Sequence, residues 1–332
     1  MRLFDLPRRT YTEFATPLEP LPRLSKALGG PEIWIKRDDQ LGLAGGGNKT
    51  RKLEYLVADA QRQGATILIT TGAAQSNHCR QTAAAACVAG LKCALVMNSN
   101  EPNPPIQGNL LLDDILGAEA HLVGPEVDRA LAMEQLAAEL RDRGEVPYII
   151  PTGGSNPVGA SAYVAAVFEL VDQLKERGLQ PTRLYHGSGS AGTQAGLVLG
   201  AKLADAPFII QAIADSGTAD SLGERVLALA NATADYLETP MRVSMDDIHI
   251  DDGHIGPGYG IATPECLEAI KLAARTEGLL LDQVYTGKAF AGMLADIRDG
   301  AVRPSETVIF LHSGGVPALF ADAETIHAGM EG

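Results

Sequence analysis

The sequence predicts an α/β protein whose sheet is mostly parallel. Short apolar runs rich in β-branched residues alternate with segments of helical periodicity along nearly all of the 332 residues, which is the order typical of α/β folds. Glycine-rich segments follow several of the apolar runs, and ligands in such folds bind at the carboxyl ends of strands. The length allows two domains packed around a cleft.

The expected elements are placed by their residue patterns. Strands are expected at 33–35, 66–70, 93–97, 121–123, 148–150, 183–186, 208–213 and 307–311. Helical spacing of apolar residues is found at 53–60, 76–89 and 194–203, and Ser76 or Asn77 is expected to cap the second of these helices. The polar segment 151–157 is expected to be a loop and a candidate crossover between domains.

Composition and charge exclude several classes of function. The net charge is −14 and only 5% of residues are aromatic, so nucleic acid is not expected as a partner. No apolar run reaches the ~18 residues of a membrane span, and residues 1–9 lack the apolar stretch of a signal peptide. The four cysteines form no CxxC pair, which is typical of reduced cytosolic thiols. We therefore expect a cytoplasmic protein with no membrane partner.

The segment 44–52 combines three glycines with a lysine at an expected helix start. Asn48 is expected to cap this helix, which places Lys49 in its first turn. The positive end of the helix disfavours the ammonium form of Lys49 and favours the neutral amine that a Schiff base requires. The alternative is a solvated basic helix start that includes Arg51 and Lys52, because most lysines are exposed.

The segment 185–193 follows an expected strand and precedes an expected helix. Its backbone N–H groups and the hydroxyls of Ser188, Ser190 and Thr193 are expected to converge on one anion. So many donors suit a phosphate monoester.

The same segment also fits a dinucleotide fingerprint. Gly187, Gly189 and Gly192 match G-x-G-x-x-G, and Asp215 lies near the position of a ribose-binding acid. Taken alone, this loop is compatible with an NAD-dependent dehydrogenase. The density of Ser and Thr and the position past mid-chain favour the phosphate interpretation.

The segment 72–81 connects an expected strand to an expected helix. The N-terminus of that helix would hold a carboxylate, and Ser76 could carry a proton in the cleft. Simple helix capping by Ser76 and Asn77 is the alternative. Further candidates are Tyr259 and Tyr285, each in a bend after an apolar run, and Ser313, which follows a strand. A tyrosine hydroxyl acts as an acid or base when cationic neighbours lower its pKa, although most tyrosines only pack.

No metal site is expected. His78 and Cys79 are adjacent, so on a helix they point about 100° apart, and no HExxH or paired-cysteine pattern occurs. Asp251 and Asp252 lie near His254, but a solvated turn explains them better than a metal centre does.

Six ordered motifs together resemble a known family. They are Gly-Gly-Asn-Lys, Gln-Ser-Asn-His, Gly-Ser-Ala-Gly-Thr, Gly-Tyr-Gly, Val-Tyr-Thr-Gly-Lys and His-Ser-Gly-Gly. In this order they resemble the D-cysteine desulfhydrase and 1-aminocyclopropane-1-carboxylate deaminase group, and the similarity extends over about residues 17–320. This group belongs to the fold-type II enzymes, which depend on pyridoxal 5'-phosphate. The resemblance implies two open, twisted, mostly parallel sheets flanked by helices, and a homodimer. We place the large cofactor-binding domain at 1–52 and 156–332 and the small domain at 53–155.

The resemblance also implies roles for individual residues. Lys49 would hold the cofactor and move protons at the substrate Cα, and Ser313 would meet the pyridine nitrogen. Asn77 would bond to the ring oxygen of the cofactor, and Tyr259 and Tyr285 would stand over the substrate. The phosphate would be wrapped by Ser188, Gly189, Ser190, Ala191, Gly192 and Thr193. The substrate carboxylate would be bound by Ser76, Asn77 and His78.

One departure from the family pattern bears on the reaction. Deaminases of the group have Glu after the tyrosine of the Val-Tyr motif, where this chain has Thr286. A hydroxyl next to the pyridine nitrogen, from Thr286 or Ser313, makes the ring a weaker electron sink than a carboxylate does. Opening of a cyclopropane is therefore ranked below β-elimination. We expect a carbon–sulfur lyase that converts D-cysteine to pyruvate, sulfide and ammonia. The alternative is an L-cysteate sulfo-lyase.

Overall fold

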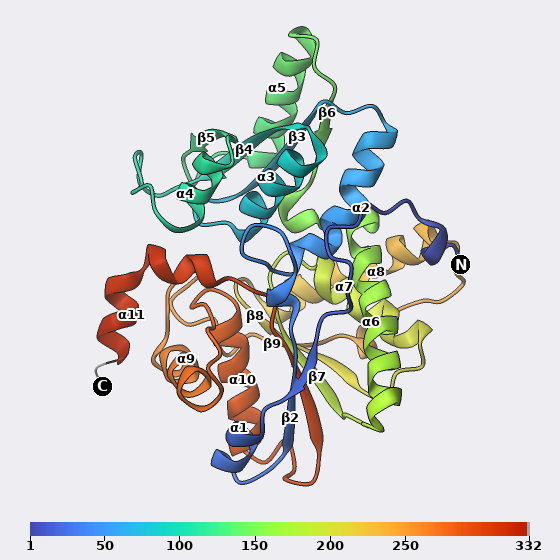
Figure 1. The fold of residues 1–332 in the computed structure, drawn as a ribbon, viewed down its shortest axis with the longest axis vertical. Helices are drawn as coiled ribbons and strands as arrows, with labels where there is room; N and C mark the ends of the chain where they lie inside the picture. Colours follow the sequence, from blue (N-terminus) through green and yellow to red (C-terminus); the bar gives the residue numbers. More distant parts are fainter. Residues whose placement is uncertain (331–332) are drawn as a thin grey trace.

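The computed structural model describes residues 1–330 and contains two separate sheets (Figure 1). The six-stranded sheet has the order β1-β2-β10-β7-β8-β9, and the four-stranded sheet has the order β5-β4-β3-β6. Every pairing is parallel except that of β1 with β2. The predicted class, with two mostly parallel sheets, is confirmed.

Each of the eight predicted strands overlaps an observed one. The large sheet consists of β1 (Leu18–Pro20), β2 (Glu32–Lys36), β7 (Arg183–Ser188), β8 (Ile209–Ala214), β9 (His249–Asp251) and β10 (Thr307–Leu311). The small sheet consists of β3 (Ile67–Ala73), β4 (Lys92–Asn98), β5 (Glu119–Val123) and β6 (Pro147–Ile149). The edge strands β1 and β9 were not predicted.

Helices cover both faces of the large sheet (Figure 1). One face packs against α6 (Pro157–Arg177), α7 (Gly192–Leu203) and α8 (Ala219–Tyr236), and the other against α1 (Pro22–Ala27), α9 (Pro264–Glu277) and α10 (Thr286–Arg298). Successive strand residues point to opposite faces, so Leu184 joins the first core and Tyr185 the second. Strands buried on both faces are apolar throughout, which is why these runs were recognisable in the sequence.

The small sheet is also covered on both faces. On one side lie α2 (Lys49–Arg62), α3 (Asn77–Ala89) and α4 (Gly108–Ile115), and on the other lies α5 (Arg129–Asp142). The remaining helix, α11 (Ala323–Met330), lies beside α9 (Figure 1). Short 3₁₀ segments are η1 (Leu3–Asp5), η2 (Asp38–Gln40), η3 (Thr152–Gly154), η4 (Met245–Asp247) and η5 (Val316–Ala321). Within residues 1–330, no helix is both long enough and apolar enough to cross a bilayer.

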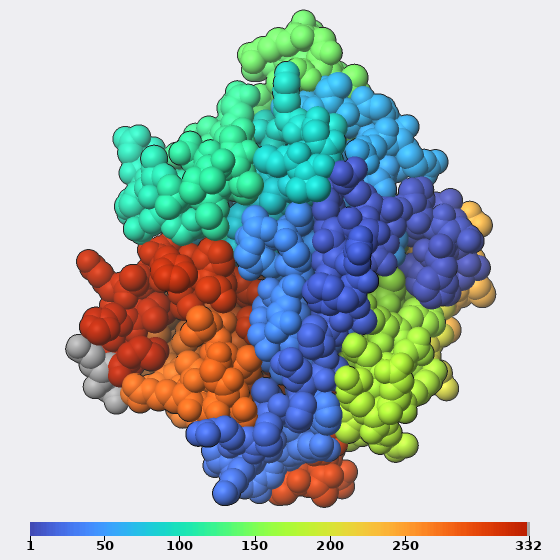
Figure 2. All heavy atoms as spheres, viewed as in Figure 1, coloured from blue at the N-terminus to red at the C-terminus, as the bar shows by residue number. Residues whose placement is uncertain are grey.

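The two sheets correspond to separate stretches of the chain. All strands of the small sheet lie within 67–149, whereas the large sheet draws on both ends of the sequence. The N-terminal segment runs across the front of the molecule over the junction between the two halves (Figure 2). The predicted boundary at 52/53 falls inside α2, which continues unbroken from Lys49 to Arg62. The exact domain limits remain a prediction.

A buried acid on α4 leads to a first prediction. Asp113 is 1% exposed, and neither of its carboxylate oxygens has a hydrogen-bond partner among the described residues. Burial raises the pKa of Asp113 from 3.8 to about 7. The folded state therefore binds this proton more tightly than the unfolded chain, and stability is lost as the pH rises between about 4 and 7.

We expect Asp113→Asn to remove this loss. Its advantage in free energy of unfolding should grow from about pH 4 to about pH 7 and reach about 2–4 kcal/mol. Denaturant unfolding of both proteins at about pH 5 and pH 8 measures the difference. Asp114 is the exposed neighbour, so Asp114→Asn is the matched control. An equal advantage at both pH values would contradict the assignment.

Candidate active site

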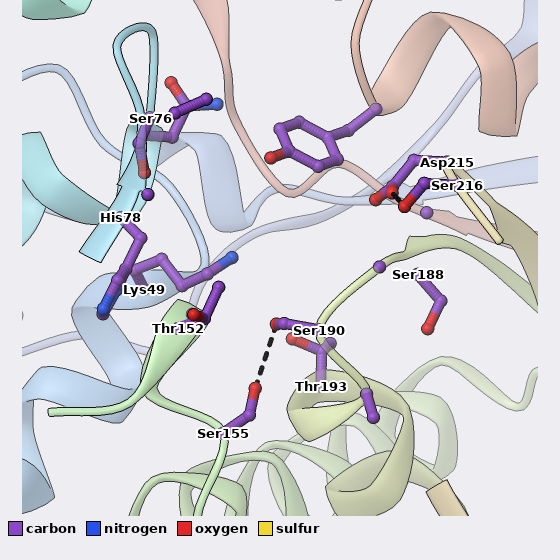
Figure 3. Close-up of a pocket in the computed structure, with 18 of the residues that line it drawn as sticks. Lys49, Ser76, His78, Thr152, Ser155, Ser188, Ser190, Thr193, Asp215 and Ser216 are labelled. Carbon is purple, nitrogen blue, oxygen red and sulfur yellow. Dashed lines mark hydrogen bonds between the residues drawn. The ribbon is translucent and has the colours of Figure 1, made fainter. Parts of the chain in front are cut away.

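A cavity of about 590 Å³ lies where the carboxyl ends of strands from both sheets converge. Residues at or just after the carboxyl ends of β3, β4, β7, β8 and β10 contribute to its wall, as expected for parallel α/β folds. Figure 3 shows Ser76 and His78 on one side, Asp215 and Ser216 on the other, and Lys49 between them. The predicted site residues that line it are Lys49, Ser76, Asn77, His78, Ser188, Gly189, Ser190, Ala191, Thr193, Tyr259, Tyr285 and Ser313. Gly192 is not among the lining residues but lies in the same loop.

Lys49 is the first residue of α2, as predicted. Its Nζ donates to Asn48 Oδ1 at 2.9 Å. Although the open cavity leaves Lys49 partly exposed, desolvation of the ammonium group lowers the pKa of Lys49 to about 8, with Arg80 lowering it further and Asp215 opposing the shift. The predicted direction of the shift is thus present, but its main cause is burial and not the helix terminus. At neutral pH a useful fraction of this lysine is the neutral, nucleophilic amine.

Asn48 occupies the cap position of α2 without capping it, contrary to the prediction. Its backbone is already helical (φ −57°, ψ −21°), and its side chain makes no capping hydrogen bond. Instead, Asn48 Nδ2 donates to Thr193 Oγ1 at 3.2 Å, while Oδ1 accepts from Lys49. The Asn48 side chain therefore connects the lysine segment to Thr193, at the start of α7.

The first turn of α2 is not the solvated basic surface that was the alternative interpretation. Arg51 is 6% exposed and Lys52 is fully buried. The guanidinium of Arg51 bonds to both carboxylate oxygens of Asp38 and to both of Glu169, at 2.8–2.9 Å. This fixes the turn that carries Lys49 to the large-sheet side of the protein.

The glycine before this turn permits a close approach of two loops. Gly47 has φ +126°, and a Cβ built on Gly314 would lie 2.7 Å from the Gly47 Cα. The Asn48 N–H donates to the Ser313 carbonyl oxygen at 3.0 Å. Glycine at both positions therefore lets Ser313, after β10, lie next to the lysine segment.

The loop between β7 and α7 has the form of an anion cradle. Ala191 has φ +70° at the turn into α7, a conformation rare for a residue with a Cβ. Ser190 Oγ accepts from Ser155 Oγ at 2.9 Å (Figure 3), and Ser155 Oγ also accepts from the Gly192 N–H at 3.2 Å. The N-terminus of α7 adds its positive end.

One hydroxyl of this loop is directed elsewhere. Ser188 Oγ donates to Gln194 Oε1 at 2.9 Å, and Figure 3 shows the side chain turned away from the cavity centre. The expected convergence of the Ser188 hydroxyl on the anion is therefore wrong. Ser155, from the loop 151–157, also lines the cavity beside Ser190.

Lys52 places an amine behind this cradle, and a bound anion would favour the charged form of that amine. Its Nζ donates to the Gly153 carbonyl oxygen at 3.0 Å, and a Cβ on Gly192 would lie 2.9 Å from the same nitrogen. Burial, together with the charge of Lys49, holds the pKa of Lys52 well below its usual range. Within residues 1–330 no carboxylate forms an ion pair with Lys52. A phosphate group in the cradle would provide the missing negative charge.

The start of α3 presents donors to the same cavity. Ser76 caps the helix by accepting from the Cys79 N–H, as predicted. The Asn77 Oδ1 accepts from Arg80 and Asn109, at 3.3 and 3.0 Å. Because these two donors fix the orientation of the amide, the Asn77 NH₂ group is left to donate toward a bound molecule.

His78 lies beside Lys49 in a neutral form. Thr70 Oγ1 gives its only proton to the Ile150 carbonyl oxygen and is 2.8 Å from His78 Nε2. The imidazole must therefore be the donor to Thr70, which leaves Nδ1 with a lone pair. Burial and the nearby lysine charges lower the pKa of His78. The ring has no proton to offer a carboxylate, so any such contact must use the backbone N–H of His78.

Tyr259 and Tyr285 form a pair at the mouth of the cavity. Their hydroxyls are 2.5 Å apart, and their rings make an edge-to-face contact at 5.9 Å. Lys288 positions the Tyr259 loop by donating to the carbonyl oxygens of Ile255 and Gly258. Desolvation, with the negative charge of Asp215, raises the pKa of both tyrosines. The condition for a readily ionised tyrosine, a pKa lowered by cationic neighbours, is therefore not met, and both hydroxyls stay protonated at neutral pH.

Ser313 and Thr286 were alternative partners for a pyridine nitrogen. Ser313 lines the cavity. Thr286 is 1% exposed and does not line it, and its hydroxyl donates to Asp282 Oδ1 at 2.6 Å. Asp282 also accepts from the backbone N–H of Val284 and Tyr285. Thr286 and Asp282 thus hold the segment that carries Tyr285, and Ser313 is the group left facing the cavity.

Sequence reasoning missed three contributors and misjudged a fourth. Lys52 and Ser155 gave no signal because their role depends on burial beside a loop distant in sequence. Asp282 could have been recognised as an acid whose side chain accepts backbone N–H groups in the turn before α10. Asp215 was considered only as a ribose-binding acid, but it is a buried acid that lines the cavity. The Asp251–His254 pair, at 3.3 Å, remains apart from the site.

These features define a class of protein. A lysine amine of lowered pKa, an anion cradle backed by a second lysine, and an amide and a serine directed into one cavity fit a phosphorylated aldehyde cofactor with a hydroxylated pyridine ring. The chain belongs to the pyridoxal-phosphate dependent enzyme family, which matches residues 9–314. Pyridoxal phosphate is its cofactor.

The chain is also similar to individual proteins of this family. The chain is 43% identical over 324 residues to a D-cysteine desulfhydrase from Klebsiella pneumoniae (strain 342), covering 96% of this chain and 97% of that protein. A crystal structure described as an ACC deaminase homologue superimposes with a TM-score of 0.90 at 34% identity, covering 99% of both chains. A pyridoxal 5'-phosphate-dependent aspartate racemase shares the fold, with a TM-score of 0.66 at 15% identity and 91% and 90% of the two chains covered. The dehydrogenase interpretation of the G-x-G-x-x-G loop is therefore wrong.

The variant Lys52→Met tests two effects of this buried lysine, one on the stability of the apoprotein and one on the affinity for the cofactor. Without cofactor, the variant should be more stable than the wild type, because a buried amine that lacks a counter-ion is removed. Its affinity for pyridoxal phosphate should fall by about 10- to 100-fold, since hydrogen bonds to charged groups contribute ~1.5–3 kcal/mol. Cofactor titration and thermal melting of the apoprotein test both signs, with exposed Lys26→Met as control. Unchanged affinity would exclude Lys52 as a phosphate ligand.

Proposed function

We propose that this protein is a carbon–sulfur lyase that converts D-cysteine and water to pyruvate, hydrogen sulfide and ammonia. The proposal depends on Lys49, whose lowered pKa allows a neutral amine, and which lies between the anion cradle and the start of α3 with its hydrogen-bond donors. The chain is also 43% identical to a D-cysteine desulfhydrase. When bound, pyridoxal phosphate supplies an electron sink for the bonds at the substrate Cα. The residues described above hold the substrate and move its protons.

In this proposal Lys49 holds the cofactor covalently and then removes the Cα proton. An amine with a pKa near 8 takes a proton and returns it at neutral pH, because its protonated and neutral forms are both populated. The cradle of Ser190, Ala191, Gly192 and Thr193, with Lys52 behind it, binds the phosphate. Ser188 and Gly189 contribute their backbone to the same loop. The Asn77 amide and the Ser313 hydroxyl face the pyridine ring.

The substrate carboxylate is assigned to the start of α3. The free backbone N–H groups of Asn77 and His78 and the hydroxyl proton of Ser76 are its donors. The positive end of a helix favours an anion there. In this proposal the substrate side chain points toward Asp215, on the opposite side of the cavity from Ser76 (Figure 3), and toward the tyrosine pair, whose pKa values the charge of Asp215 affects.

The tyrosine pair is assigned to the departing sulfur. Because both hydroxyls stay protonated, either Tyr259 or Tyr285 is able to donate a hydrogen bond or a proton to the leaving thiolate. Tyr259 is 42% exposed, so it can be reprotonated from solvent after each turnover.

Pyruvate release from D-cysteine, L-cysteine and L-cysteate, measured in parallel on cofactor-saturated protein, tests the proposal. Preferred turnover of D-cysteine with release of sulfide is the expected result. Pyruvate from L-cysteine alone would show that the substrate is the L-enantiomer and not the D-enantiomer. No pyruvate from any of the three would exclude them as substrates and overturn the proposed reaction, while leaving the cofactor assignment intact.

L-Cysteate is the second candidate because two cations line the cavity. Arg129 and Arg225 are both at its wall, and a guanidinium binds a sulfonate well. Arg129 is already engaged by Asn98 Oδ1 at 3.0 Å. Pyruvate and sulfite released from L-cysteate alone would favour this candidate.

The proposal also includes the oligomeric state, the cellular location and the domain limits of the protein. We infer a cytoplasmic homodimer, as is usual for the group that the motifs resemble, with a small domain at 53–155. Light scattering on the purified protein distinguishes a dimer of this 34.9 kDa chain from a monomer.

A further inference from the structure

Asp215 is a buried carboxylate in the cavity that no part of the proposed reaction uses. It follows β8 and is 2% exposed. Its Oδ1 accepts from Ser216 Oγ at 2.7 Å, whereas Oδ2 has no hydrogen-bond partner among the described residues. A Cβ on Gly189 would lie 2.2 Å from Oδ2. The glycine therefore makes room for the carboxylate beside the phosphate-binding loop.

Charged groups of both signs face Asp215. Lys49 and Lys288 lower its pKa, Asp282 raises it, and burial is the largest influence, so that the pKa of Asp215 rises to about 6. Its charge in turn raises the pKa of Tyr259 and Tyr285. Neither lysine forms an ion pair with Asp215 within residues 1–330. Above about pH 6, the side of the cavity next to the tyrosines thus carries an incompletely compensated negative charge.

We infer that Asp215 determines which β-substituents the site accepts: it excludes anionic groups such as sulfonates and carboxylates, and admits neutral hydrogen-bond donors such as a thiol. This inference rests on the proposed function, because it assumes that the side chain of an amino acid points toward the tyrosine pair. A sulfonate has no proton to donate and would meet a like charge in a desolvated place, which is strongly unfavourable. A neutral thiol near this carboxylate would meet no such charge repulsion.

Two arginines at the cavity wall would have the opposite effect to Asp215 on an anionic side chain. Arg129 and Arg225 would attract the same anion that Asp215 repels; Arg129 is half-buried and Arg225 is exposed, whereas Asp215 is buried. If the arginines dominate, removal of the Asp215 charge will have no effect on the choice between neutral and anionic side chains.

Binding of amino acids that do not eliminate gives a readout independent of turnover. D- and L-alanine and D- and L-aspartate are titrated into the holoenzyme, and the cofactor absorbance reports the dissociation constants. Asp215→Asn should tighten the binding of aspartate relative to alanine by about tenfold or more, because a desolvated like-charge contact is removed. Asp220→Asn removes an equal charge from the exposed start of α8 and should leave the ratio unchanged.

Turnover gives a second readout. In Asp215→Asn the ratio of kcat/KM for L-cysteate to that for D-cysteine should rise by about tenfold or more. Asp215→Ser is the second variant, in case the amide does not retain the cofactor. An aspartate-to-alanine ratio equal to that of the wild type, in whichever variant binds cofactor, would overturn the inference. Failure of the wild type on every sulfur amino acid would instead overturn the proposed function, while the binding ratio would still decide the role of Asp215.

Discussion

Lys49→Ala is expected to lose turnover by about 10³-fold or more, because one side chain supplies both the covalent attachment and the proton transfer. Reduction of the wild-type holoenzyme with borohydride should fix the cofactor on the peptide that contains Lys49, as detected by mass spectrometry. The variant should yield no such peptide. Turnover is measured with D-cysteine at saturating cofactor.

Two further variants distinguish the chemistry of the amine from its charge. Lys49→Arg keeps a cation but cannot become neutral, because arginine stays protonated in proteins, so it should be as inactive as Lys49→Ala. Lys26→Ala changes an exposed lysine on α1 and should behave as the wild type. Turnover at the wild-type rate in Lys49→Ala would contradict the assignment of cofactor attachment and proton transfer to Lys49.

Arg51→Met is expected to produce the largest loss of stability. Arg51 bonds to Asp38 and Glu169, and Lys36 also donates to Glu169, at 2.5 Å. Removal of the guanidinium leaves a buried carboxylate, Asp38, without its cation. Such uncompensated charges cost about 3–5 kcal/mol. Denaturant unfolding should show this decrease, and exposed Arg62→Met on the same helix should show almost none.

A second substitution tests whether charge or packing causes the loss. In Arg51→Met/Asp38→Asn the carboxylate is neutralised, so the double variant should recover part of the stability. The pH dependence has a defined sign as well. Hydrogen bonds and charges from Arg51 and Lys36 outweigh burial and lower the pKa of Glu169 to about 2, so this contribution is present above pH ~4 and is lost as the pH falls toward 2. No recovery in the double variant would attribute the loss to packing alone.

The fold was largely predictable because its strands are of the buried parallel kind. Runs such as 93–97 are apolar throughout, since both of their faces are covered by helices. The strands that escaped prediction lack this property. β1 (Leu18–Pro20) and β9 (His249–Asp251) are three residues long and lie at the two edges of the sheet, where proline and polar residues are tolerated.

The site was predictable where its chemistry is local in sequence. The glycine-rich lysine segment, the serine-rich loop and the tyrosine motifs each appear as contiguous residues. Roles that depend on contacts between distant segments were not predictable. Ser155 contacts Ser190 only because the loop after β6 folds against the loop after β7. Likewise, the sequence did not reveal that desolvation would raise, and not lower, the pKa of the two tyrosines.

The first turn of α2 also has a consequence for protein engineering. Three side chains leave this turn in three directions, since residues 49, 51 and 52 are about 100° apart per position on a helix. Lys49 points into the cavity, Arg51 into the buried ion network, and Lys52 behind the phosphate cradle. A designer who grafted the reactive lysine onto another scaffold would therefore have to transplant the whole turn, together with Asp38, Glu169 and the Gly153 loop, as a single module.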